Sequence, residues 1–270
     1  MRGVAPFKDA YSMKLPGTSF MYAILIFVFG HTNQGVHLGL VFINAATMYF
    51  LFIAFKKIFN SFIGLSTASV YGFMAIGYIF DGFAAHATHF ICFYSSIALL
   101  FLGYFMKSGK RWTIFLCGLM FGMAFLMKQQ AVFLILFGIA FSAIYLKSEK
   151  KQKIREIIKS LLLFGSGVCV PYLILLFIIL LTGQFSVFWL WTVRYASTYE
   201  AVKSVDAISQ YFNISFLPAW RVFYYLWALA LLGVFVLYWS PYNRLQKLFA
   251  MIYFIASACV LSAGFYYRPH

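Results

Sequence analysis

Residues 112–146 read WTIFLCGLMFGMAFLMKQQAVFLILFGIAFSAIYL, two apolar runs separated by the polar tripeptide KQQ at 128–130. Each run is close to the length of a membrane-spanning helix, since about 20 residues cross a bilayer. One continuous helix would hold Lys128 in the middle of the membrane, where a charge is costly. We therefore predict a hairpin of two helices, 112–127 and 131–146, with Lys128 at the membrane boundary.

The composition of the whole chain agrees with this interpretation. The 270 residues are 64% hydrophobic and 10% charged, with a mean hydropathy of +0.88, whereas soluble domains carry about 25% charged residues. The net charge of +15 would suit a nucleic-acid partner, but the Lys and Arg residues form small groups between apolar runs. We expect an all-α, polytopic membrane protein with no nucleic-acid partner. Its four cysteines form no CxxC pair, so we predict no metal site.

Apolar runs predict about eight transmembrane helices in one transmembrane domain, 1–270. Within it we expect an outer loop with an interfacial helix (1–35), six spans (36–182), an outer loop (183–221) and two spans (222–264). The predicted spans are 36–55, 61–80, 89–106, 112–127, 131–146, 160–182, 222–239 and 248–264.

The distribution of charge predicts the orientation of these spans. Thirteen Lys and Arg residues with two acids fall in alternate joints, whereas the other joints and the termini hold eight Lys and Arg, four acids and all five histidines. Cytoplasmic loops are enriched in Lys and Arg. We therefore expect the basic joints to be cytoplasmic and segments 1–35 and 183–221 to be extracytoplasmic. The basic joints are 56–57, 107–111, 147–159 and 244–247.

Two outer segments have the features of interfacial helices. Residues 17–30, GTSFMYAILIFVFG, are apolar but too short to cross a membrane. The segment 183–221 is aromatic at first and then mixed. We expect a helix in the membrane interface there, with Trp189, Trp191 and Trp220 at headgroup level.

The opening loop is the first candidate for chemistry. Lys8, Asp9 and Lys14 stand beside the short apolar helix, at the depth of lipid phosphates. The ammonium groups could hold a phosphate, and Asp9 could accept a proton from an acceptor hydroxyl. The alternative is a solvated loop whose lysines anchor it at the interface.

Histidines and further cations make up the remaining candidates at the outer boundary. His86 and His89 would share a helix face and could contact a polar substrate; the alternative is a polar cap. Lys128 could meet a phosphate or merely extend to the interface. Arg268 and His270 could act with them, or belong to an aromatic belt that ends in a charge.

Five blocks of sequence resemble bacterial membrane glycosyltransferases of the GT-C superfamily. The resemblance is to the dolichyl-phosphate-mannose–protein mannosyltransferase-like group, glycosyltransferase family 39, and it covers essentially the whole chain. The blocks, in order, are PFKDAYSMKLPGTSFMYAILIFVFGHTNQGVHLGLVFINAAT (6–47), AAHATHF (84–90), GLMFGMAFLMKQQAVFLILFG (118–138), FWLWTVRYASTY (188–199) and GFYYRPH (264–270).

The resemblance implies a transfer of sugar from a polyprenyl-phosphate carrier in the bacterial inner membrane, on its outer face. The acceptor would be a lipid, glycan or protein hydroxyl, and no cofactor is implied. Lys14 would contact the carrier phosphate, with Lys128 and Arg268 as further cations. His86 and His89 occupy a region where relatives often carry a substrate contact.

The same resemblance implies a departure from the family pattern. Relatives usually have one more span before the opening loop, and it ends in an acidic pair that supplies the principal catalytic carboxylate. Asp9 is the acid that remains in this opening loop, and it does not clearly match that position. We therefore expect a GT-C-like core truncated at both ends, with its principal base outside this sequence.

Two other classes of protein fit the hydropathy. A transporter or flippase would share the basic inner loops, but it predicts repeats and broken spans near mid-membrane, which the sequence does not show. An inactive fragment or a non-catalytic membrane subunit fits the missing acid. The residues give no indication of an oligomeric state.

Overall fold

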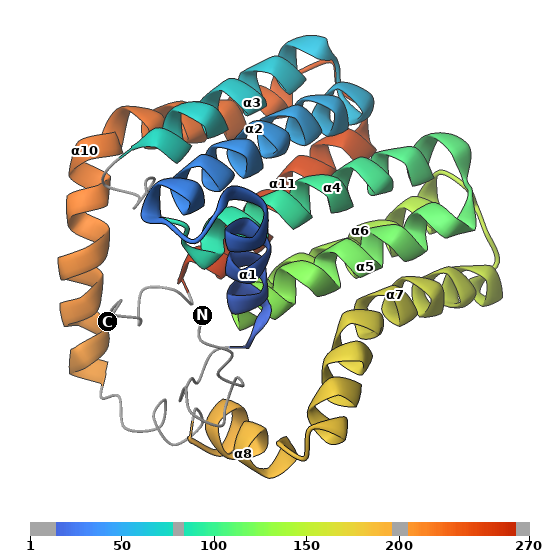
Figure 1. Ribbon diagram of the computed structural model, residues 1–270. Helices are drawn as coiled ribbons and strands as arrows, with labels where there is room; N and C mark the ends of the chain where they lie inside the picture. Colours follow the sequence, from blue (N-terminus) through green and yellow to red (C-terminus); the bar gives the residue numbers. More distant parts are fainter. Residues whose placement is uncertain (1–14, 78–83, 196–204, 263–270) are drawn as a thin grey trace.

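The computed structural model describes residues 15–77, 84–195 and 205–262, and this part of the chain is helical without strands (Figure 1). The all-α prediction is confirmed for these residues. In chain order the elements are α1 (Gly17–Phe29), α2 (Asn33–Ile58), α3 (Ser61–Ile76), α4 (Ala87–Ser108), α5 (Arg111–Met127), the 3₁₀ turn η2 (Gln129–Ala131), α6 (Val132–Ser148), α7 (Ile154–Leu181), α8 (Phe185–Trp189), the π-helix η3 (Leu190–Tyr195), α10 (Val205–Trp239) and α11 (Arg244–Ser262).

Local sequence signals explain where several helices begin and end. The Thr32 hydroxyl accepts a hydrogen bond from the Gly35 backbone N–H at 3.0 Å, and the Asn60 side chain accepts one from Ile63 at 2.9 Å. Side-chain acceptors of this kind satisfy N–H groups that have no partner within the first turn of a helix. Gly109 ends α4 at φ 65°, a left-handed conformation that glycine adopts without steric cost.

The hairpin predicted around Lys128 is confirmed. Helices α5 and α6 are separate, and the 3₁₀ turn η2 joins them. Tyr145, in the last turn of α6, donates a hydrogen bond of 2.5 Å to the Met106 carbonyl near the end of α4. Since α5 starts just after α4 ends, α5 and α6 run in opposite directions.

Aromatic side chains fill the centre of the bundle. Phe121, Phe137, Phe164 and Phe249 are fully buried and come from α5, α6, α7 and α11 respectively. The rings of Phe137 and Phe249 pack edge to face with centroids 5.4 Å apart, a favourable arrangement for aromatic pairs. This cluster joins helices that are far apart in the sequence into one core.

Small residues allow α5 and α7 to approach each other closely. A Cβ atom added at Gly118 or Gly122 would overlap the backbone of Phe164 or Val168 on α7, and one at Gly167 would overlap Phe115 on α5. The Gly-x-x-x-Gly spacing in α5 is therefore used for close helix packing, as such spacings are in membranes.

Four helical segments in the described part are long and apolar enough to span a membrane: α2, α4, residues 129–148 and α7. The predicted spans 61–80 and 112–127 correspond to α3 and α5, which are apolar but have only 16 and 17 residues. The protein is thus an integral membrane protein. The described residues contain four candidate spans, and the total of about eight stays a prediction. Large apolar side chains such as Phe62, Phe73 and Leu162 are exposed on the outside of the bundle, which suits contact with lipid.

Several helix ends differ from the ends of the predicted spans. Helix α2 begins at Asn33, three residues before the predicted span 36–55, because Thr32 caps it. Helix α3 stops at Ile76, four residues before the end of the predicted span 61–80. Helix α10 runs without interruption from 205 to 239, so it crosses the predicted division between the outer segment 183–221 and the span 222–239, and that division stays a prediction.

Helix α7 is bent. Figure 1 shows its first half lying along α5 and its second half turning away toward α8. Pro171 lies inside α7 and is buried. A proline removes one backbone hydrogen bond and crowds the preceding turn, so it accounts for a bend of this kind.

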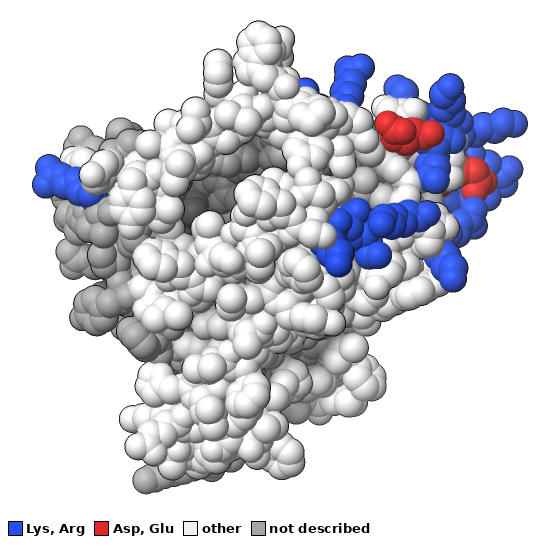
Figure 2. Space-filling model, turned by 90° about the horizontal axis from the view of Figure 1, so that it is seen from above, with Lys and Arg blue, Asp and Glu red and all other residues white. Residues whose placement is uncertain are grey.

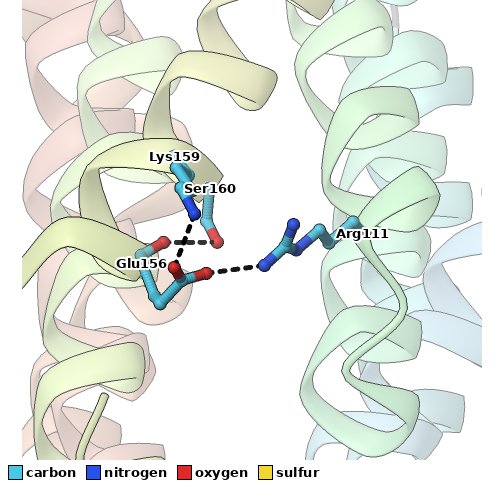
Figure 3. Close-up of polar contacts among 4 residues, drawn as sticks. All are labelled: Arg111, Glu156, Lys159 and Ser160. Atoms are coloured by element: carbon cyan, nitrogen blue, oxygen red, sulfur yellow. Dashed lines mark hydrogen bonds and ion pairs between the residues drawn. The ribbon is translucent and has the colours of Figure 1, made fainter. Parts of the chain in front are cut away.

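The four basic joints gather at one end of the bundle, which we call the basic end (Figure 2). There Glu156 pairs with Arg111 of α5 at 2.6 Å and with Lys159 at 2.7 Å (Figure 3). The Gln246 side chain donates to the Ile58 carbonyl at 2.7 Å, which ties α11 to α2. Exposed ion pairs contribute little stability, so the packed helices rather than these charges determine where the joints meet.

Candidate functional site

The candidate site lies at the opposite end of the bundle, which we call the α1 end. There α1 packs against the end of α5, while α4 begins at Ala87 and η2 carries the chain from α5 into α6. Figure 1 shows α1 running across the neighbouring helices rather than along them. Helix α1 has thirteen residues and is mostly apolar, which suits the interfacial helix predicted from the sequence. Its position in a membrane stays a prediction.

Helix α1 is held on α5 by contacts that need small residues. The Thr18 hydroxyl donates a hydrogen bond of 3.2 Å to the Met127 carbonyl, one of the last carbonyls of α5. A Cβ atom on Gly17 would overlap the Leu126 carbonyl oxygen. The sequence Gly-Thr at the start of α1 therefore seats the helix directly beside Lys128.

Helix α1 also contacts α4, and this second contact is aromatic and uncharged. Tyr22 packs edge to face on Phe90 with ring centroids 6.3 Å apart, and Tyr94 donates a hydrogen bond to the Met21 sulfur at 3.1 Å. Burial raises the pKa of the Tyr22 phenol above its ordinary value, because the charged form would lose its hydration. This wall of the site thus remains uncharged at neutral pH.

The chain enters the described region at Leu15, which is buried in a small cluster with Ile179 of α7 and Phe188 of α8. The bend at Pro171 turns the second half of α7 toward this cluster (Figure 1). Leu15 follows Lys14 directly in the sequence. The attachment point of the opening loop is therefore fixed at the α1 end.

Lys128 stands between two helices in an extended conformation, with φ −158° and ψ 131°. It is half-buried, and its carbonyl accepts a hydrogen bond of 3.0 Å from Ala131 that closes the 3₁₀ turn. Lys128 thus belongs to a defined hairpin, whose place at the membrane boundary stays a prediction. A cation in this position can attract a phosphate.

The two histidines do not share a helix face, which corrects the sequence prediction. His86 precedes α4 in an extended conformation, and its Nδ1 lies 3.3 Å from the Thr88 hydroxyl. His89 lies within α4, is 7% exposed, and its Nδ1 is 3.0 Å from the Asn44 side-chain oxygen. His86 is the N-cap of α4 and His89 lies in its first turn, so the two side chains have different hydrogen-bond partners.

Asn44 is a residue of this region that the sequence analysis did not single out. Its side-chain oxygen also accepts a hydrogen bond of 2.9 Å from Tyr71 of α3, so α2, α3 and α4 meet at one amide. Polar side chains often join helices in this way within membranes. An asparagine inside the apolar run LVFINAATM (40–48) was the available signal.

A π-helical turn, η3, follows α8 at the same side of the molecule as the bent half of α7. It contains Thr192, which is buried and donates to the Phe188 carbonyl at 2.6 Å, and the exposed Arg194. Such wide turns often occur at functional sites, because they change the direction of side chains. Trp189 is exposed and Trp191 half-buried, whereas the Trp220 side chain lies outside the described residues.

Five of the predicted site residues lie outside the described residues. The described side chains include two acids, Glu149 and Glu156, and both belong to the basic end. At the α1 end the described part therefore offers cations, imidazoles and hydroxyls, but no carboxylate. The five residues outside the described part are Lys8, Asp9, Lys14, Arg268 and His270.

Comparison with known proteins gives one positive result. The model of a family described as dolichyl-phosphate-mannose-protein mannosyltransferase matches residues 13–175, more than half of the chain. No curated protein and no solved structure gives a significant match. The matched range includes α1, both histidines and the Lys128 hairpin.

Proposed function

The chain belongs to the dolichyl-phosphate-mannose-protein mannosyltransferase family, and from this premise we propose that it transfers a sugar from a polyprenyl-phosphate-linked donor. The acceptor is a hydroxyl of a lipid, glycan or protein, and the reaction takes place at the α1 end. Membership of the family makes the protein a membrane glycosyltransferase of the GT-C type. The donor, the class of acceptor and the side of the membrane are parts of the proposal.

One observation carries the proposal. The family match covers 13–175, and within that range the fold brings the start of α1, the start of α4 and Lys128 to one end of the bundle. The basic joints gather at the other end (Figure 2). Because basic loops favour the cytoplasmic side, we assign the α1 end to the outer face of a bacterial inner membrane.

The chemistry of the transfer assigns roles to residues at the α1 end. A base removes the proton from the acceptor hydroxyl, and the acceptor oxygen forms a bond to the anomeric carbon. The bond from that carbon to the carrier phosphate breaks, and polyprenyl phosphate leaves with both bonding electrons. Lys14 and Lys128 stabilise the charge on that phosphate, and Lys8 and Arg268 are assigned the same role.

Two further roles follow for the remaining candidates. Asp9 is the acid that remains in the opening loop, and in this proposal it accepts the proton in place of the acidic pair that relatives carry. His86 and His270 contact the sugar or the acceptor. His89 has a supporting role, because its hydrogen bond to Asn44 links α4 to α2.

The proposal is tested by measuring sugar transfer from a radiolabelled polyprenyl-phosphate mannose by the full chain in proteoliposomes. Lys128→Ala and Lys14→Ala should each lower transfer by about 10- to 100-fold, since each removes a cation from the leaving phosphate. Lys110→Ala, an exposed lysine at the basic end, is the matched control and should leave transfer unchanged. Full transfer by both Lys14→Ala and Lys128→Ala would refute the phosphate role.

The base is tested in the same assay. Asp9→Asn should lower transfer by about 100-fold or more, since general bases contribute on the order of 10² to 10⁴. Binding of the donor should be nearly unchanged, because the carboxylate acts on the acceptor. Transfer that survives in Asp9→Asn would show that another group removes the proton.

A further inference from the structure

A cleft opens at the basic end, remote from the proposed site of sugar transfer. It has a volume of about 330 Å³, within the usual range for small-molecule sites. Its walls are the ends of α2, α4 and α6, the joint after α6 and the start of α11. The lining residues include Lys57, Lys107, Tyr145, Glu149, Lys150 and Gln246.

The walls of this cleft are held by hydrogen bonds between helices. Tyr145 of α6 donates to the Met106 carbonyl of α4, and Gln246 of α11 donates to the Ile58 carbonyl of α2. Gln246 is itself fixed, because its backbone N–H donates to the Asn243 side chain at 2.8 Å. The cleft is therefore a built feature of four helices.

Two of the three lysines in the cleft lie against aromatic rings. The Lys57 ammonium is 3.9 Å from the centre of the Tyr104 ring, and the Lys150 ammonium is 5.8 Å from the centre of the Tyr145 ring. The stem of Lys57 runs past Gly103, where a Cβ atom would lie 3.3 Å from its Cδ. These contacts limit where the ammonium groups can go.

The positive charge of the cleft exceeds the negative charge within it. The cleft is lined by three lysines, Lys57, Lys107 and Lys150, and by one acid, Glu149. Among the described residues, the two ion pairs that the structure shows both involve Glu156, which does not line the cleft. Like charges drawn together repel, and a bound anion relieves that repulsion. The cleft is thus complementary to an anionic ligand.

We propose that this cleft binds a phosphate group, presented by an anionic lipid headgroup or by a soluble phosphate. Lys57 and Lys107 each stand one residue before the end of their helix, where the apolar run gives way to charge. That depth matches the headgroups of a bilayer, and basic pockets between helix ends bind such headgroups. The proposal is independent of sugar transfer at the α1 end.

The test is a binding titration of the full chain in detergent, read by native mass spectrometry. The probes are phosphatidylglycerol, phosphatidylcholine and inorganic phosphate. One copy of phosphatidylglycerol should bind with saturation, and phosphatidylcholine should not. Binding or competition by inorganic phosphate at equal affinity would identify a soluble phosphate as the source, and its absence would identify the lipid.

Charge removal inside and outside the cleft distinguishes a site from a diffuse basic surface. Lys57→Gln with Lys107→Gln should weaken binding about 25-fold, since each lysine near an anionic headgroup contributes roughly a five-fold factor. Lys147→Gln with Lys153→Gln removes the same charge from exposed positions outside the cleft and should change binding less than about two-fold. An equal loss in both pairs, or equal binding of phosphatidylcholine, would overturn the proposal.

Two more variants keep the test informative if the double substitution disturbs folding. Lys150→Gln alters an exposed side chain, so it should fold and weaken binding about five-fold. Lys107→Arg keeps the charge and should retain binding. Binding that is unaffected by Lys150→Gln and by Lys57→Gln with Lys107→Gln would also refute the site.

Discussion

Asn44 illustrates how a single side chain organises this protein. Its amide oxygen accepts hydrogen bonds from Tyr71 and from His89, which belong to two other helices. An amide oxygen can only accept a hydrogen bond, so Nδ1 of His89 carries a proton and donates it to Asn44. His89 is also one of the residues that the sequence predicts to contact substrate. A histidine held in this way can support a site without touching the reacting atoms.

Replacing Asn44 should therefore cost stability. Asn44→Leu removes the acceptor of the buried His89 and the half-buried Tyr71, so we expect a loss of about 1–3 kcal/mol in the free energy of unfolding. The measurement is unfolding in mixed micelles of increasing denaturing-detergent content. Gln34→Ala, an exposed position on the same helix, is the control. Equal midpoints for Asn44→Leu and the wild type would contradict the role of this amide.

At the scale of elements, glycines determine which helices come close. Gly118 and Gly122 place α5 directly on the backbone of α7, and Gly35 and Gly39 seat α1 on α2. A Cβ atom added at Gly165 of α7 would meet no other atom within 4 Å. Both Gly-x-x-x-Gly spacings are visible in the sequence, and both lie at close helix contacts in the structure. The partner helix of each pair could not be found there, because spacing alone does not identify the opposite surface.

Alanine at these glycines should have opposite effects. Gly118→Ala pushes a methyl group into the Phe164 carbonyl, so we expect a loss of about 1–3 kcal/mol as the helices separate. Gly165→Ala meets no neighbouring atom and should be neutral or stabilise by about 0.5–1 kcal/mol, since alanine favours the helix. Thermal unfolding in detergent compares the two variants. A Gly118→Ala protein as stable as Gly165→Ala would show that the close approach is not required.

At the scale of the whole molecule, charge is separated along the bundle. The basic joints gather at one end (Figure 2), whereas α1 lies at the other (Figure 1), together with the start of α4 and the turn η2. Exposed apolar side chains cover the helices between the two ends. We propose that each end contacts a different aqueous phase, one used by the transfer at the α1 end and the other by the phosphate cleft.

The sidedness of the two ends can be measured directly. In a variant whose four cysteines are replaced, Gln129→Cys at the α1 end should react with a membrane-impermeant maleimide in intact cells. Gln152→Cys at the basic end should react only after lysis, because the basic loops are retained in the cytoplasm. Both positions are exposed or lie in a turn, so access to the reagent is comparable. The reverse labelling pattern would place the proposed site on the cytoplasmic side.

The sequence by itself determined that this is a helical membrane protein with basic joints in alternation and a break at Lys128. These features depend on the length of apolar runs and the position of charges, which a bilayer constrains strongly. The resemblance to GT-C glycosyltransferases was likewise present in the sequence and is supported by the family match. The start of α4 and the unbroken course of α10 were not, because a helix boundary depends on caps and on neighbouring helices.

Only the tertiary structure decided which polar residues meet. It joined His89 to Asn44, 45 residues earlier in the chain. It also brought Lys57, Lys107 and Lys150 from three separate joints into one cleft. Such contacts arise when helices distant in sequence pack together, and hydropathy does not record which faces of those helices touch.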